Sequence, residues 1–97
     1  MAAGSFTANG TSDSQYVKRG GEGVHLSLAG EFGGGIVAVE HMVNGTPYPL
    51  LDEGAAITFS AAADVLLNVV SGDIVSLVLT GATSPSIDFE IAGAELV

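Results

Sequence analysis

The chain contains no cysteine and no tryptophan, and only two of its 97 residues are basic. Without cysteine, no disulfide can stabilise the fold and no thiolate can bind a metal. A single domain of this length buries roughly 65 % of the surface of its unfolded chain, which leaves modest stability. We therefore expect it to gain stability by self-association or by docking on a partner.

Positive charge is also scarce. The sequence has 11 acidic residues against 2 basic ones, Lys18 and Arg19, which gives a net charge of −9. Nucleic-acid binding requires several Lys or Arg side chains to displace counterions, and an anionic membrane surface would repel this chain. We expect no nucleic-acid and no membrane partner. The acidic surplus either serves solubility alone or favours a partner with a basic or neutral surface.

Long apolar segments are missing as well. The first residues, MAAGSF, lack the basic and apolar regions of a signal peptide. No run of about 18 apolar residues follows that could span a membrane. The sequence therefore predicts a protein that is made in a cytoplasm and used from there.

The sequence does contain apolar and polar residues that alternate with period two, the pattern of half-buried strands. Residues 54–70 are the one segment that a helix could claim, but Thr58, Phe59 and Val65 favour strands and no clear helix cap precedes them. The clearest strand candidates are residues 24–29, 36–43, 74–80 and 87–91, with shorter ones at 15–19, 56–60 and 65–70 and an edge strand at 6–8.

Glycine, proline, asparagine and serine punctuate these runs at regular intervals, as in Asn44-Gly45 and Ser84-Pro85. Short strands at such spacing predict an all-β fold. We expect a single-domain antiparallel β-sandwich of about seven or eight strands, jelly-roll or Ig-like, with a small barrel as the alternative. The sandwich should span residues 6–97, and residues 1–5 should form a flexible N-terminal arm.

A glycine-rich stretch, GEFGGGIV, joins two of the strand candidates. We interpret Gly33 to Gly35 as the tip of a β-hairpin, because glycine takes a positive φ without steric cost. The same arrangement occurs twice, either as two equivalent hairpins with similar loops at one end or as a coincidence between amphipathic strands. At one constant offset, Val24, Leu26, Leu28, Gly30 and Ile36 match Val75, Leu77, Leu79, Gly81 and Ile87.

Residues that could carry catalysis do not form a recognisable set. His25 and His41 have no third histidine and no cysteine beside them, whereas zinc requires three or four ligands. Serine, histidine and aspartate are present, but a G-x-S-x-G motif is not. We therefore expect no enzyme activity, no metal and no cofactor.

Two other features could mediate binding. Asp88 and Glu90 project from one face of a strand, which suits a solvated face, an acidic docking face or part of a calcium site. Phe32 and Tyr48 are the aromatic residues predicted to lie in loops. Each could form a platform for a sugar or a plug over an open end of the sandwich.

Four segments carry a resemblance to a known group of proteins. They read FTANGTS, V-x-L-x-L-x-G-x-F-G-G-G-I-V-x-V-E, PLLDEG and GDIVSLVLTGATSPSI, in this order between residues 6 and 91. The chain resembles small virion structural proteins of tailed bacteriophages, β-sandwiches that include capsid decoration (cement) proteins and head or tail components. Tyr48 stands where many of these relatives have tryptophan.

The resemblance implies a capsid decoration protein on the outer capsid surface of the virion, made in the host cytoplasm. Its partners would be the major capsid protein and itself, as a homotrimer that bridges capsid subunits. Another virion component (a head fibre, tail tube or baseplate accessory) and a module that binds a host receptor or glycan are the alternatives. We expect contacts from residues 6–11, 31–35 and 46–51, in particular Phe6, Asn9, Thr11, Phe32, Gly34, Tyr48 and Leu50.

Overall fold

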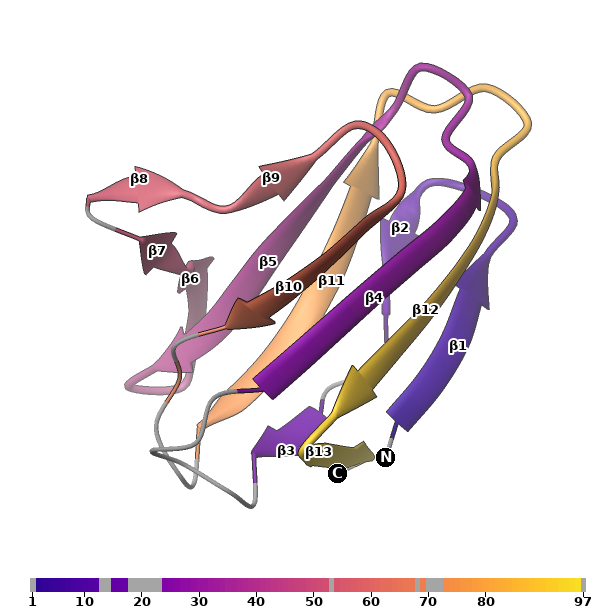
Figure 1. Cartoon of the computed structure of the whole chain (residues 1–97). Coiled ribbons are helices and arrows are strands. Elements are labelled where there is room, and N and C mark those ends of the chain that lie inside the picture. The colour runs from indigo at the N-terminus through magenta and orange to yellow at the C-terminus, as the bar shows by residue number, and fades with distance from the viewer. Residues whose placement is uncertain are drawn as a thin grey trace.

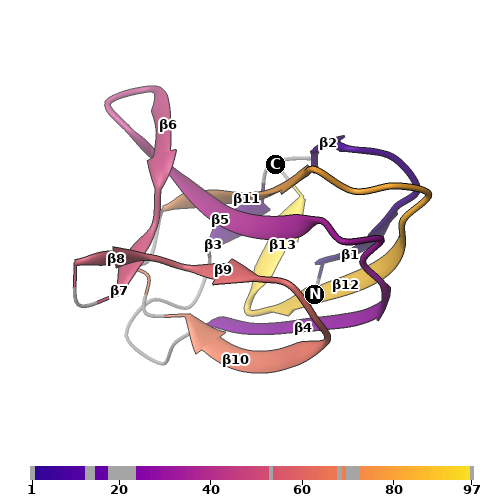
Figure 2. The same cartoon turned by 90° about the horizontal axis from the view of Figure 1, so that it is seen from above.

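The computed structural model describes residues 2–12, 15–17, 24–52, 54–67, 69 and 73–96. Two antiparallel sheets pack face to face (Figures 1 and 2), and the described residues contain no helix. The predicted all-β sandwich is thus confirmed, and residues 54–67 form strands as expected. The described residues form thirteen strands, more than the seven or eight that the sequence predicts. The number is higher because several of the strands are only two or three residues long.

The smaller sheet has four strands of five to eight residues. In spatial order these are β1 (Ala2–Phe6), β12 (Ser86–Ala92), β4 (Val24–Glu31) and β10 (Ala63–Leu67). Burial alternates along β12 and over the first five residues of β4, as period-two side chains on a half-buried sheet require. The strands at its two edges, β1 and β10, are unbroken.

The larger sheet has seven strands and is built around two long central ones. Its path runs β13 (Ala94–Leu96), β3 (Gln15–Val17), β11 (Ile74–Thr80), β5 (Ile36–Val43) and β6 (Thr46–Pro49). Two more strands, β2 (Gly10–Thr11) and β9 (Thr58–Phe59), pair beside this path. Most of the short strands that the sequence did not predict therefore belong to the larger sheet.

Short strands cover the outer edges of β11 and β5 in two pieces. On β11, β2 (Gly10–Thr11) pairs beside β3, and on β5, β9 (Thr58–Phe59) pairs beside β6. Between β6 and β9 the chain leaves the sheet as a two-stranded ribbon of β7 (Leu51–Asp52) and β8 (Ala55–Ala56). Interrupted edges of this kind disfavour pairing between sheets of different molecules.

The core fills the space between the inner faces of the two sheets. Phe6 and Phe89 lie side by side on the smaller sheet, with ring centroids 5.4 Å apart. Burying each aliphatic side chain here stabilises the fold by roughly 1.5–3 kcal/mol. The largest fully buried side chains are Leu26, Leu67, Leu77, Leu79, Ile87, Ile91, Val24, Val37, Val39 and Val75.

The predicted hairpin at Gly33 to Gly35 is wrong. The strands that flank it, β4 and β5, belong to different sheets, so the loop crosses the sandwich from one sheet to the other. Gly33 and Gly34 take φ values of +61° and +78°, and Phe32 is buried between the sheets at this end. The sheets lie about 10 Å apart, and a loop with left-handed residues can turn the chain across that distance and bring Phe32 inward as a plug.

The repeat is visible in the structure as a second crossover. β11 and β12 also lie in different sheets, and their loop packs against the first at one end of the molecule (Figure 1), where the Thr83 backbone N–H donates to the Gly33 carbonyl at 2.9 Å. The two repeats differ after the loop: of the matched residues Ile36 and Ile87, the first is 47 % exposed and the second is fully buried. Two loops at one end are confirmed, but they are crossovers and not hairpins.

The N-terminal segment also differs from its prediction. Residues 2–5, expected to form a flexible arm, continue with Phe6 as β1 and pair with β12 over five positions, from Ala2 opposite Ile91 to Phe6 opposite Ile87. The residues of this segment are small and show no alternation of apolar and polar side chains, so the sequence did not predict a strand here. In the structure they lie beside β12 in the same sheet. The predicted strand at residues 15–19 is described only as far as Val17, and Lys18 and Arg19 lie outside the described residues.

Candidate partner-binding surface

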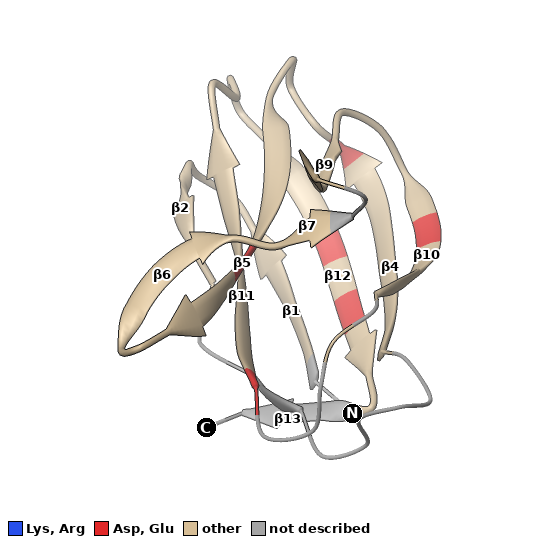
Figure 3. Ribbon diagram, turned by 90° about the vertical axis from the view of Figure 1, so that its left-hand side faces the viewer, with Lys and Arg blue, Asp and Glu red and all other residues tan. Residues whose placement is uncertain are grey.

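Large apolar side chains are exposed mainly on one side of the sandwich. Among the described residues, Ile36, Val43, Tyr48, Leu51 and Leu66 are exposed, and the last four fall within residues 43–67. This segment runs from the end of β5 through β6, β7, β8 and β9 to β10, and we call it the open side. Figure 3 looks onto it: β6 and β7 lie in front, and no part of the β6 ribbon has the colour of acidic residues.

A tight hairpin forms the first part of the open side. Asn44 and Gly45 have φ values of +54° and +80°, as a type I′ turn requires, so the predicted Asn-Gly turn is confirmed here. The following strand, β6, contains Pro47 and Pro49, which donate no backbone hydrogen bonds and suit an edge strand. Tyr48 lies between them, opposite His41 on β5, and half of its surface is exposed.

The β7–β8 ribbon projects from the sheet edge next to this hairpin. Three backbone hydrogen bonds hold its base: Leu50 N–H to the Val39 carbonyl at 2.9 Å, Val39 N–H to the Ile57 carbonyl at 3.1 Å, and Ile57 N–H to the Leu50 carbonyl at 3.2 Å. Leu50 is buried at the base, whereas Leu51, the next residue, is 58 % exposed. The ribbon therefore presents an apolar side chain on a support that is bonded to the central strand.

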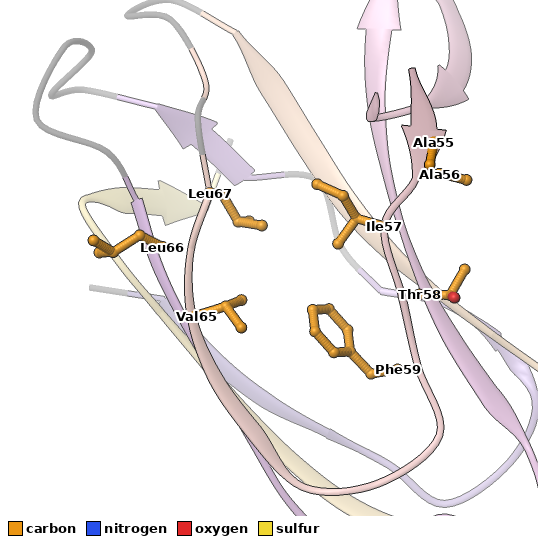
Figure 4. A pocket seen from close by; sticks show the side chains of 8 residues that line it. All are labelled: Ala55, Ala56, Ile57, Thr58, Phe59, Val65, Leu66 and Leu67. Carbon is orange, nitrogen blue, oxygen red and sulfur yellow. The ribbon is translucent and has the colours of Figure 1, made fainter. Parts of the chain in front are cut away.

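A cavity of about 310 Å³ separates this edge from the other sheet. It is lined by residues 55–59 of β8 and β9 and by residues 65–67 of β10 (Figure 4). Ile57, Phe59 and Val65 point into it and are partly buried against the core, whereas Leu66 points away and is 74 % exposed. We call this cavity the mouth, because the core is open to solvent between the two sheet edges.

Three of the predicted contact residues belong to the core. Phe6, Phe32 and Leu50 are each only 6 % exposed. Phe6 packs on Phe89, Phe32 closes the crossover end and Leu50 lies under the ribbon. Phe32 and Leu50 were predicted to lie in surface loops, because they adjoin glycine- and proline-rich stretches, and Phe6 was predicted to begin an edge strand. All three side chains instead pack in the core. Their side chains are not available to a partner.

The other four predicted residues lie at the surface in different places. Tyr48 is on the open side, and Gly34 is exposed at the tip of the first crossover. Thr11 is exposed on β2, at the opposite edge of the larger sheet. Asn9 holds the loop after β11: its Nδ2 donates to the Ala82 carbonyl at 3.0 Å and its Oδ1 accepts from the Ala82 N–H at 2.9 Å.

Val43 and Leu66 lie outside the predicted contact regions, whereas Leu51 falls within the predicted region 46–51 without being among the residues named there. Leu51 follows the buried Leu50, and Leu66 precedes the buried Leu67. An apolar pair does not reveal which member faces the core, so only the paired strands decide it. The signal that could have found Leu66 is the alternation of β10 itself, in which Val65 and Leu67 share a face.

Both histidines pair with aspartates. His41 Nδ1 lies 3.1 Å from Asp73 Oδ2, and the other oxygen of Asp73 accepts the Ile74 backbone N–H at 2.9 Å. His25 Nε2 lies 3.9 Å from Asp64 Oδ1 on the exposed face of the smaller sheet. The described residues contain no group of three or more His, Cys, Asp or Glu arranged to hold a metal ion. Neither pair is joined by a third ligand there.

The charges that the structure describes are acidic. Asp88 and Glu90 on β12 and Asp64 on β10 are exposed on the outer face of the smaller sheet, as predicted for the first two (Figure 3). Both cations of the chain lie outside the described residues. The open side thus exposes apolar side chains on β6 and β7, although β7 also contains Asp52, and it is bordered by the carboxylate of Asp64 on β10.

Comparison with known proteins gives no relative from which a role could be transferred. No known family model, no curated protein and no solved structure matches the chain. No helix among the described residues has the length and apolar character needed to cross a bilayer.

Proposed function

We propose that the chain is a capsid decoration protein of a tailed bacteriophage, which binds the outer surface of the assembled capsid and stabilises it without catalysis. The observation that carries the proposal is the open side. Of the five large apolar side chains that are exposed among the described residues, four lie there, on two projecting hairpins and the edge strand β10. The sequence resemblance to small phage virion proteins supports the same assignment.

This role requires contact surfaces and no reaction centre. A protein that binds the assembled lattice but not the free subunit stabilises the assembly by mass action. Tyrosine is enriched among residues that dominate binding energy, and Tyr48 and Leu51 are each exposed over half or more of their surface. The major capsid protein is the partner that the resemblance implies. Three copies of the chain around a capsid axis would strengthen attachment without any new type of contact.

Co-sedimentation with expanded empty capsids tests the proposal. We expect the wild-type chain to pellet with capsids, and the double variant Tyr48→Ser/Leu51→Ser to bind at least about 30-fold more weakly, a loss of ~2 kcal/mol. Ile36→Ser is the matched control, because Ile36 is exposed to a similar extent but lies outside residues 43–67. This control should bind within about threefold of wild type.

Other outcomes would contradict the proposal in informative ways. A wild-type chain that pellets with tails and not with capsids would be a different virion component. Depletion of the chain by host cells or polysaccharide, with no capsid binding, would make it a receptor- or glycan-binding module. Size-exclusion chromatography with light scattering should give a trimer, and a strict monomer that ignores capsids would refute the assignment.

A further inference from the structure

We infer that β10 and the mouth accept an extended segment of the partner as an added strand, and that this segment carries lysine or arginine at positions that alternate with apolar residues. The inference rests on the proposed function, since it names the docking element of the open side. It deepens that function by specifying the chemistry and the conformation of the partner segment.

The first observation is the free edge of β10. The spatial order β1-β12-β4-β10 places β10 at the end of the smaller sheet, and in the described part of the chain no strand pairs with its far side. An edge strand presents unpaired N–H and C=O groups that a further strand can bind. β10 contains no proline over its five residues, ADVLL. β6, the other edge on the open side, contains two and is a poor template.

The second observation is the incomplete core beside that edge. Four hydrophobic residues pack against the core while staying partly buried, and three of them, Ile57, Phe59 and Val65, line the mouth. A strand added to β10 would lie about 4.8 Å from it, with alternate side chains pointing toward the mouth. Apolar side chains at those positions would enter the mouth, which has a volume of about 310 Å³, and would complete the core there.

The third observation is charge, which selects the occupant. The remaining side chains of an added strand would point to the outer face, next to exposed Asp64 and Leu66 on β10. The same face carries Glu31, Asp88 and Glu90 on β4 and β12. A second copy that added its own β10 here would bring Asp64 to this acidic face, and the like charges would repel at this edge. Self-association through other surfaces is not affected by this repulsion. Lysine or arginine on the added strand would instead lie close to a carboxylate.

Synthetic peptides test the inference on the pure, full-length chain. The probe is an acetylated seven-residue peptide with valine at odd and lysine at even positions. One control replaces lysine with glutamate, and another carries N-methyl groups along the backbone, which removes its hydrogen-bond donors. We expect the lysine peptide to bind and to protect the amides of β10 from hydrogen exchange. The glutamate peptide should bind at least about tenfold more weakly, and the N-methylated peptide should not bind.

A charge reversal on β10 sharpens the test. Asp64→Lys should reduce the preference for the lysine peptide by at least about tenfold. Asp88→Lys, the same change two strands away on the same face, should alter it less. Both positions are exposed, so both variants should keep the wild-type fold, checked by circular dichroism.

Three results would overturn the inference: equal binding of the lysine and N-methylated peptides, binding that leaves β10 amides unprotected, or protection of β10 by self-association without peptide. Capsid co-sedimentation separates this inference from the proposed function. Capsid binding without peptide binding would refute only the strand addition. Peptide binding at β10 without capsid binding would refute only the capsid assignment.

Discussion

The two outer edges of the larger sheet are both covered by pairs of short strands, but they close the sandwich to different degrees. At the β11 edge, residues 9–12 are tied down by side-chain bonds: Asn9 bonds twice with Ala82, and Ser12 Oγ accepts the Leu77 N–H at 2.9 Å. At the β5 edge, the chain between β6 and β9 leaves the sheet and the core stays open at the mouth.

The difference shows what each edge contributes. The closed edge joins residues separated by 65 and 73 positions in the sequence, and such links stabilise the native fold at a cost in chain entropy on closure. At the open edge, Tyr48 and Leu51 are 50 % and 58 % exposed, and Leu66 on β10 of the smaller sheet is 74 % exposed. The apolar surface that these side chains leave in water contributes nothing to the stability of the isolated chain. We therefore expect mutations to separate stability from binding according to the edge on which they lie.

The largest effect should come from the border between core and open side. Leu67→Ala should destabilise the fold by about 2–5 kcal/mol, because Leu67 is 1 % exposed and its truncation leaves a cavity. Leu66→Ala, one residue earlier but 74 % exposed, should change stability by less than about 0.5 kcal/mol. Urea unfolding followed by circular dichroism measures both. Equal losses for the two variants would contradict the burial pattern of β10.

The crossover end, where the two loops connect the two sheets, should give the next largest effect. Gly33→Ala should cost about 2–4 kcal/mol, since it combines a positive φ with a Cβ that would collide with the Thr83 carbonyl and weaken the bond from Thr83 N–H. Gly34→Ala has the positive φ but free space around it, so the loss should be about 1 kcal/mol. Thermal unfolding of the two variants gives the comparison, and a larger loss for Gly34→Ala would refute the packed crossovers.

The smallest separable effect should come from the closed edge. Asn9→Ala should cost about 1–2 kcal/mol by removing both hydrogen bonds with Ala82. Asn9→Asp keeps the acceptor for the Ala82 N–H but sets a carboxylate oxygen against the Ala82 carbonyl in place of the donor, so it should lose about as much. Neither variant should alter capsid binding, because Asn9 lies outside the open side. Reduced capsid binding at unchanged stability would move the contact surface to this edge.

Much of the fold could be predicted from the sequence, because alternation states which residues of a strand face inward. Val24, Leu26 and Leu28 are buried as predicted, as are Val75, Leu77 and Leu79. The crossovers could not be predicted, since a short glycine-rich loop can return a strand to the same sheet or carry it to the other one. That choice depends on the partners of β4 and β5, which are distant in sequence.

The candidate site was predicted only in part for a similar reason. Tyr48 is exposed between two prolines, as its local sequence indicates. Phe6, Phe32 and Leu50 have the same kind of neighbours but fill the ends of the core. Exposure at the mouth depends on how far two sheet edges stand apart, and no local pattern encodes that separation. Alternation along β10 can place Leu66 on the exposed face, but its position beside the mouth follows only from the assembled sandwich.

Hydrogen–deuterium exchange of the chain, free and bound to capsids, tests most directly that the open side is the binding side. The account predicts that binding slows exchange within residues 43–67, above all at β10, and leaves residues 2–12 unchanged. Slower exchange confined to residues 2–12 and the β11 edge, or no change anywhere on capsid-bound chains, would contradict it.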